Sequence, residues 1–287
     1  MARVAPGGDE FMQIRIKAAL AALAAVVIGG GAWTLAAAVE PVQPRPALAE
    51  PSLSPDGQSI AFASGGDIWT APVSGGTARL LVTDPATESR PLWSPDGTRL
   101  AFVSNRSGVS NLYILTLASG VVTRLTWGDS SDALDGWSRD GKWIYFTSGA
   151  NDVQRQGDIF RVKATGGVPL EVSAERYLNE FQAAPSPDGK AIALAAKGMS
   201  SVQWWRHGSS HIDQSELWLK PIAAGAPYQL LVPSGARHAW PMWRPDGGAI
   251  WYMSDEGGEE NLWRLTLGGK PEQITRFTGG RVLWPTV

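Results

Sequence analysis

Residues 93–103 read Trp-Ser-Pro-Asp-Gly-Thr-Arg-Leu-Ala-Phe-Val, a turn sequence followed at once by an apolar run. The tetrapeptide Ser-Pro-Asp-Gly recurs at residues 54–57 and 186–189, and looser copies read Ser-Arg-Asp-Gly at 138–141 and Arg-Pro-Asp-Gly at 244–247. Successive Asp-Gly steps lie 40, 44, 48 and 58 residues apart, counted from aspartate to aspartate. Such a period is typical of the blades of a β-propeller.

Each repeat contains enough short apolar segments for four strands. Asp-Gly suits a tight hairpin, because Gly accepts a positive φ and Asp bonds to its own turn backbone. An apolar strand follows it, as at residues 100–103, then an aromatic strand such as Leu217-Trp218, a Gly-rich turn and a short last strand, as at 124–126. A four-stranded meander cannot bury both faces alone, so it must stack on its neighbours. We therefore predict an all-β fold, a β-propeller of four-stranded antiparallel blades over residues 51–287.

The last residues of the chain repeat the start of the fifth unit. Residues 282–287 read Val-Leu-Trp-Pro-Thr-Val, which matches His-Ala-Trp-Pro-Met-Trp at 238–243. We expect five complete blades plus the start of a sixth, as in a truncated six-bladed ring that is a fragment of a longer protein. An inner strand left unpaired is a liability that natural sheets avoid.

The N-terminal 50 residues have the composition of a targeting segment and a linker. Residues 18–39 carry no charge and follow Arg15 and Lys17, which predicts a signal peptide over residues 1–39. A membrane anchor is the alternative, because 22 uncharged residues can span a bilayer. Translation from Met12 in place of Met1 would leave a purely basic start. Residues 40–50 are rich in proline and read as a linker, so we expect an exported protein, periplasmic or secreted.

Bulk composition excludes several functions. A formal net charge of -2 argues against a nucleic-acid surface, and the absence of Cys excludes disulfides and thiolate metal sites. The sequence contains no nucleophile elbow, no phosphate-binding Gly loop and no dinucleotide fingerprint. We therefore expect no catalytic residue, no cofactor and no metal in this chain.

The longest insertion supplies the candidate binding face. It lies between Gly189 and Leu217, in the loop that joins the second and third strands of the fourth unit. Together with the connection that follows this unit, it gathers the three histidines and an aromatic pair, namely Trp204, Trp205, Arg206, His207, His211 and His238. Packing of the aromatic pair onto the ring is the interpretation we favour. A surface that docks a peptide or a domain is the second, and a histidine metal site is the third.

Three acidic residues form a second candidate in the connection between the second and third units. Asp129, Asp132 and Asp135 recur at intervals of three, which does not match an EF-hand loop. Asp is also a standard loop-forming residue, so we favour a purely structural role for all three.

The repeats show a broad resemblance to one known family and a narrower resemblance to another. Trp-Ser-Pro-Asp-Gly followed by an apolar and an aromatic strand resembles the WD-like repeats of periplasmic TolB-type propellers, over residues 50–287. Within the third to fifth units and at the C-terminus, residues 180–189, 203–206, 210–218 and 280–286 are similar to the N-terminal propeller of bacterial tricorn-type serine peptidases. The tricorn resemblance implies a six-bladed first propeller, followed by a second propeller, a PDZ-like module and a catalytic domain with Ser and His. It also implies propellers that filter unfolded peptides toward the catalytic chamber.

The resemblance leads to a functional hypothesis. We expect a non-catalytic propeller module of an exported tricorn-like serine peptidase, which binds or gates peptide or unfolded protein substrate. Its partners are then that substrate and the downstream peptidase domains. One alternative is a TolB-type periplasmic scaffold for protein interactions. Another is the size-filter propeller of an α/β-hydrolase peptidase of the prolyl-oligopeptidase kind.

Overall fold

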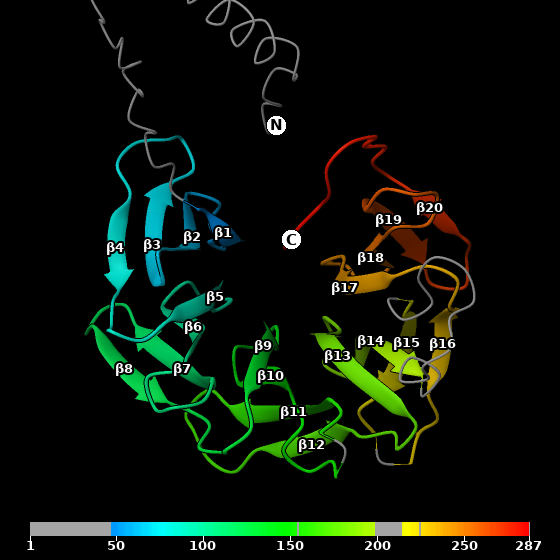
Figure 1. The fold of residues 1–287 in the computed structure, drawn as a ribbon, viewed down its shortest axis with the longest axis horizontal. Coiled ribbons are helices and arrows are strands. Elements are labelled where there is room, and N and C mark those ends of the chain that lie inside the picture. Colours follow the sequence, from blue (N-terminus) through cyan, green and yellow to red (C-terminus); the bar gives the residue numbers. More distant parts are fainter. Residues whose placement is uncertain (1–46, 154, 199–213, 224, 287) are drawn as a thin grey trace, which may run out of the picture. The chain divides into compact units, whose positions relative to one another are not determined.

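The computed structural model describes residues 47–153, 155–198, 214–223 and 225–286, which belong to the compact unit Pro46–Val287. Their regular structure consists of five four-stranded sheets, each a meander of antiparallel strands in sequence order. Figure 1 shows these sheets side by side about a common centre, with the first strand of each innermost. The prediction of a β-propeller with five four-stranded blades is confirmed.

The blades follow the predicted repeats closely. Blade 1 comprises β1 (Ala49–Leu53), β2 (Ser59–Ser64), β3 (Asp67–Pro72) and β4 (Arg79–Val82). Blade 2 comprises β5 (Glu88–Trp93), β6 (Arg99–Ser104), β7 (Asn111–Thr116) and β8 (Val121–Arg124). Blade 3 comprises β9 (Asp132–Trp137), β10 (Trp143–Ser148), β11 (Asp158–Lys163) and β12 (Leu170–Ser173).

Blade 4 comprises β13 (Leu178–Pro185), β14 (Ala191–Gly198), β15 (Glu216–Pro221) and β16 (Gln229–Val232). Blade 5 comprises β17 (His238–Trp243), β18 (Ala249–Ser254), β19 (Asn261–Thr266) and β20 (Pro271–Gln273). The long insertion falls between the second and third strands of blade 4, as predicted. β1 begins at Ala49, inside the stretch assigned to the linker. Within the described residues, no helical segment has the length and apolar character that crossing a bilayer requires.

The outer strands end earlier than the sequence suggested. The sequence indicated a last strand at residues 124–126 of blade 2, whereas β8 stops at Arg124. The reason is that a side-chain oxygen replaces a backbone carbonyl as the acceptor of a hydrogen bond. The Leu112 N–H donates to Thr126 Oγ1 at 3.0 Å. Blade 5 repeats the device, with the Leu262 N–H donating to Thr275 Oγ1 at 2.9 Å. A threonine hydroxyl thus satisfies a donor beyond the last residue of the strand.

The core lies between the blades and not within them. Phe102, Leu100 and Tyr113 of blade 2 pack against Ala61 and Ile68 of blade 1, and all five are nearly fully buried. The opposite face of blade 2 packs against blade 3 in the same way, and two further buried clusters join blades 3 and 4 and blades 4 and 5. This is the radial stacking that strands with two apolar faces require.

The Asp-Gly turns have the expected geometry. In blade 2 the Gly97 N–H donates to the Ser94 carbonyl at 2.8 Å, and Gly97 has a φ of 68°. Ser94 Oγ donates to Asp96 Oδ1 at 2.6 Å and accepts from the Arg99 N–H at 2.9 Å. The bond from Ser94 Oγ and two bonds from Thr98, from its backbone N–H and its hydroxyl, lower the pKa of Asp96 to about 2. The Ser and Asp of the tetrapeptide therefore clamp the start of the second strand.

Replacing Ser94 with alanine is expected to lower the free energy of unfolding by about 1–2 kcal/mol, because Ser94 is fully buried and its partners lose their bonds. The pKa of Asp96 is expected to rise toward its ordinary value. Urea unfolding at neutral pH measures the first effect. Ser74→Ala in the exposed hairpin between β3 and β4 is the control, with an expected change of about 0.5 kcal/mol or less. Equal losses in the two variants would contradict this role for the turn.

Candidate functional site

Irregularities in the inner strands place five side chains at the centre of the ring. In blades 1, 2, 4 and 5, two residues of the inner strand oppose one residue of the second strand. The first residue of each bulge has a positive φ without being Gly, with values of 53° for Glu50, 53° for Arg90, 56° for Gln182 and 52° for Trp240. The inner strand of blade 3 bulges at Asp135. Such strained backbone is typical of functional sites, and we call these five residues the bulge row.

Members of the bulge row connect neighbouring inner strands. The Arg90 N–H donates to Glu50 Oε2 at 2.6 Å, and the Trp240 N–H donates to Gln182 Oε1 at 2.8 Å. The backbone N–H groups of Ala183 and Gln182 bond to the Asp135 carboxylate. The side chain of one blade therefore satisfies the backbone of the next blade, which fixes the side chains around the axis.

Arg90 joins two blades that are not neighbours. Its guanidinium carbon lies 4.3 Å from the centroid of the Trp240 ring, although these residues come from β5 of blade 2 and β17 of blade 5. Its Nε donates to the Leu134 carbonyl at 3.3 Å. This cation–π stack links the inner strands of blades 2 and 5.

Asp135 is the acidic group of the bulge row. Burial raises its pKa to about 7, and the bond from Thr147 Oγ1 at 2.8 Å, the neighbouring backbone N–H groups and the charge of Arg90 oppose the rise. Burial lowers the pKa of Arg90, and the charges of Asp135 and Glu50 act against that change. The centre of the ring therefore contains a buried acid whose pKa is raised by burial and a guanidinium whose charge opposes that rise.

Tryptophans form a second layer next to the bulge row. The indole N–H of Trp93 donates to the Ser52 carbonyl at 3.1 Å, and that of Trp137 donates to the Leu92 carbonyl at 3.1 Å. Trp243 repeats the contact with the Ala184 carbonyl at 3.0 Å. In each case the tryptophan at the end of one inner strand bonds to the preceding inner strand, so the three rings have fixed positions.

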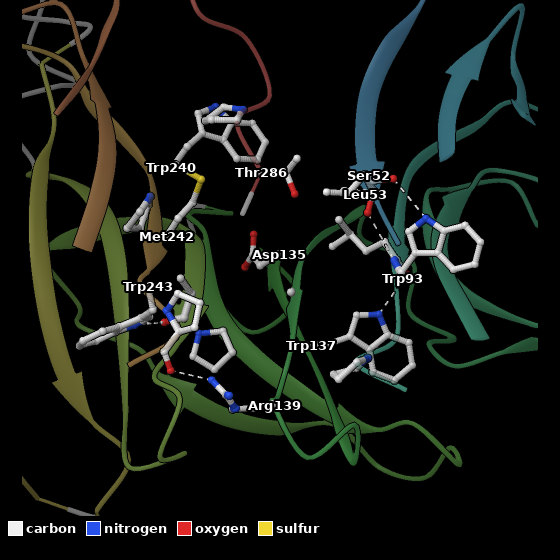
Figure 2. A pocket seen from close by; sticks show the side chains of 18 of the residues that line it. Ser52, Leu53, Trp93, Asp135, Trp137, Arg139, Trp240, Met242, Trp243 and Thr286 are labelled. Atoms are coloured by element: carbon white, nitrogen blue, oxygen red, sulfur yellow. Dashed lines mark hydrogen bonds between the residues drawn. The ribbon is translucent and has the colours of Figure 1, made fainter. Parts of the chain in front are cut away.

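These layers line a central cavity of about 700 Å³. Figure 2 shows Trp240 and Trp243 on one side of it, Trp93 and Trp137 on the other, and Asp135 between them. The remaining lining residues come from the inner strands, the Asp-Gly turns and the last residues of the chain, including Leu53, Arg90, Gln182, Met242, Pro285 and Thr286.

The Asp-Gly turns form the rim of this cavity. Pro55, Pro95, Pro187 and Pro245 line it at the turns of blades 1, 2, 4 and 5. Arg139 occupies the corresponding place in blade 3, and its Nη1 donates to the Pro245 carbonyl at 2.6 Å, from blade 3 to blade 5. A volume of this size falls within the range of small-molecule and peptide pockets.

The structure describes one of the six residues of the binding face predicted from the histidines, His238. Trp204, Trp205, Arg206, His207 and His211 lie outside the described residues, so that face stays a prediction.

His238 is described, and it is the first residue of β17. Its side chain is 2% exposed and packs edge-on against Tyr252 at 5.7 Å, and burial lowers its pKa. Its backbone N–H donates to Ser215 Oγ at 3.0 Å, close to the end of the insertion. His238 is therefore a core residue and not part of a surface.

The three acidic residues do not form one cluster. Asp129 is exposed in the connection, whereas Asp132 is buried in β9 and Asp135 lines the cavity. The interpretation of Asp132 and Asp135 as loop residues is wrong, because β9 begins at Asp132. Within the described part of the chain, no group of three His, Cys, Asp or Glu side chains is arranged to hold a metal.

Sequence reasoning missed the bulge row, although a signal exists. Glu50, Arg90, Gln182 and Trp240 each stand four residues before the first residue of the Asp-Gly tetrapeptide, and three of them precede a proline. Proline inside an otherwise regular strand indicates a bulge or an edge. Aligning the repeats on this position would have identified the row.

Comparison with known proteins places the chain among propellers of this kind. The model of the tricorn protease N-terminal β-propeller domain matches residues 45–287. The chain belongs to this family. The matched range includes every residue that the structure describes, and therefore the whole cavity and the bulge row.

Individual relatives agree with the family assignment. Tricorn protease homolog 1 of Streptomyces coelicolor is 26% identical over 216 residues, which are 75% of this chain and 20% of that protein. The structure of the tricorn protease has a TM-score of 0.64 at 19% identity and covers 83% of this chain and 23% of its own. TolB from Acinetobacter baumannii also has a TM-score of 0.64, at 22% identity, over 83% of this chain and 56% of its own. At this identity the two structures show a shared fold. This tricorn N-terminal propeller spans between 20% and 49% of the first three curated relatives it matches.

Proposed function

We propose that this propeller is a non-catalytic module of a larger exported tricorn-like serine peptidase, and that it binds or gates peptide or unfolded protein substrate at the central cavity. The observation that carries the proposal is the cavity itself. Side chains from all five blades line it, and bonds between the blades hold them in place. A preformed pocket with fixed aromatic walls and polar groups at defined positions is typical of a binding site. Membership in a family named for a protease supports a peptide as the ligand.

We further propose that the ring continues into a sixth blade supplied by the rest of a longer protein. Trp284 has a φ of 49°, close to the 52° of Trp240, and each of these residues precedes a proline. Phe62 of blade 1 is half-buried, whereas the equivalent Phe102 of blade 2 is fully buried by blade 1. In a longer protein with a sixth blade, Phe62→Ala is expected to cost as much stability as Phe102→Ala.

The proposed location is outside the cytoplasmic membrane. It is supported by the uncharged residues 18–39, which follow a basic start and precede a proline-rich stretch. Downstream peptidase domains are then the covalent partners of the propeller, and a membrane is contacted only through an N-terminal anchor, if the signal is retained.

Blocking the cavity tests the binding function. The chain has no Cys, so Leu53→Cys introduces a single thiol at a 45% exposed cavity residue. Coupling a bulky maleimide there is expected to weaken binding of a fluorescein-labelled casein digest by about tenfold or more in fluorescence anisotropy. The labelled peptides are expected to stay intact.

A matched control separates occlusion from labelling itself. Val73→Cys places the thiol on an exposed residue outside the cavity lining, in the same blade. The maleimide is expected to leave binding unchanged at this position. Equal binding by both blocked variants, or no binding by the unmodified chain, would contradict the proposal.

A scaffold for folded envelope proteins is the second candidate, favoured by the TM-score of 0.64 to TolB. A scaffold would bind its partners on the outer surface of the blades. Blocking the cavity would then leave binding of the folded partner unchanged.

A further inference from the structure

The cavity wall is unusually rich in two residue types. Seven of its 25 lining residues are proline and four are tryptophan. The prolines come from the Asp-Gly turns, from the inner strands and from Pro285, so they lie on several sides of the cavity. Flat rings with few rotamers present a rigid apolar surface, against which other flat rings pack with little loss of entropy.

The prolines and three of the four tryptophans of the wall offer no free hydrogen-bond donor. Proline has no backbone N–H, and the indole N–H groups of Trp93, Trp137 and Trp243 already bond to backbone carbonyls. Within the described residues, the Trp240 indole N–H and the Gln182 Nε2 have no hydrogen-bonding partner. Both groups are hydrogen-bond donors, so a ligand that satisfies them has to supply acceptors.

Arg90 adds further donors at the centre of the cavity, and Arg139 and Thr286 add others at its edge. Its Nε bonds to the Leu134 carbonyl, and its two terminal nitrogens have no hydrogen-bonding partner in the described part of the chain. The charge of Arg90 is compensated by Asp135 and Glu50. These donors therefore suit a ligand that brings hydrogen-bond acceptors and apolar rings.

An ordinary extended peptide matches this chemistry poorly. Each of its residues carries an N–H that loses water on entry, and a buried donor without an acceptor costs free energy. The Asp135 carboxylate is the acidic acceptor in the lining, and Thr147 and two backbone N–H groups already donate to it. A segment with several prolines removes most of this cost.

We infer that the central cavity binds an extended proline-rich polypeptide segment, whose rings pack against the tryptophans and prolines and whose carbonyls accept from Trp240, Gln182 and Arg90. This inference rests on the proposed function and names its ligand class. A polyproline II segment has no internal hydrogen bonds and displays its carbonyls outward. Its recognition by aromatic-lined grooves is a general mode of binding.

Two fluorescein-labelled peptides of equal length and charge provide the test. One alternates proline with glutamine, and the other has alanine in place of every proline. In anisotropy titrations of the full chain, the proline peptide is expected to bind about tenfold more tightly or better. Equal affinities, or tighter binding of the alanine peptide, would overturn the inference while leaving the proposed function in place. Failure of both peptides and of the casein digest would overturn both.

Two tryptophan variants locate the binding. Trp240→Ala is expected to weaken binding of the proline peptide by about tenfold or more, because it removes a ring and a donor. Trp127→Ala is the matched control, because Trp127 is 72% exposed and lies outside the cavity lining. Circular dichroism checks that each variant folds. If Trp240→Ala does not fold, the maleimide-blocked Leu53→Cys protein replaces it, with the same expected loss. Unchanged affinity in the folded Trp240→Ala protein or in the blocked protein would overturn the inference.

Discussion

Replacing Phe102 with alanine is expected to lower the free energy of unfolding by about 3–5 kcal/mol. Phe102 is fully buried, stacks on Tyr113 with ring centroids 5.7 Å apart, and packs against Ala61 and Ile68 of the preceding blade. Truncation leaves a cavity between two blades that the rigid sheets cannot collapse to fill. Urea unfolding, followed by tryptophan fluorescence, measures the loss.

Phe62→Ala is the matched control for radial stacking. Phe62 has the same place in blade 1 as Phe102 has in blade 2, but it is half-buried. Its removal is expected to cost roughly 1–2 kcal/mol, since less apolar surface returns to water. Equal costs at the two positions would show that each blade buries its phenylalanine by itself, which would contradict a core built between blades.

The stability of the protein is expected to fall as the pH rises from about 4.5 to about 7. Burial raises the pKa of Glu180 to about 7, and burial likewise raises the pKa of Asp135 to about 7 and that of Asp158 to about 6. These acids hold protons in the folded state that the unfolded chain has released, so their stabilising contribution is complete at low pH and is lost through this window.

Glu180 is expected to account for a large share of this fall in stability. It is fully buried, Ser173 Oγ donates to its Oε1 at 2.9 Å, and its Oε2 has no hydrogen-bonding partner in the described part of the chain. A shift from 4.5 to about 7 corresponds to about 3 kcal/mol.

Glu180→Gln tests this assignment. The amide keeps the size of the side chain and an acceptor for Ser173 but cannot ionise, so the fall in stability between pH 4.5 and 7 is expected to shrink by most of that amount. Glu259→Gln, at an exposed position in blade 5, is expected to leave the pH dependence unchanged. Urea midpoints measured at several pH values decide the outcome. An unaltered slope in Glu180→Gln would show that Glu180 is already ionised in the folded protein.

The turns set the acidic limit of stability. Bonds from Ser94 and Thr98 lower the pKa of Asp96 to about 2, and bonds from Ser138 and Lys142 lower that of Asp140 to about 2. Their contribution is present above the unfolded value of 3.8 and is lost as the pH falls toward 2. Maximum stability is therefore expected near pH 4.5, between the loss toward pH 2 and the loss toward pH 7.

Most of the fold could be predicted from the sequence, because its determinants are local. The Asp-Gly turn needs only neighbouring residues, as the bond from Ser94 to Asp96 shows. The continuous apolar run of strands such as β6 gives two apolar faces, because successive side chains point to opposite sides of the sheet, and two apolar faces require a neighbour on each side. Blade number, strand order and the position of the long insertion followed from these patterns.

The candidate site could not be predicted in the same way. Insertion length directed attention to the histidines, yet the one histidine described is a buried residue beside Tyr252. Aspartate is common in loops, which favoured a loop for Asp135, and the influence of the Arg90 charge on Asp135 depends on how the blades are arranged.

The sequence by itself determined the hairpin turns, the alternation of the strands and the repeat that makes stacking around an axis necessary. Only the tertiary structure decided which side chains meet at the centre, since Arg90 and Trp240 are 150 positions apart in the chain and meet through a positive φ at each residue. Local sequence patterns determine turns and strands, because these form between residues that are close in sequence. The direction of a side chain at a strained bulge depends on the blades around it.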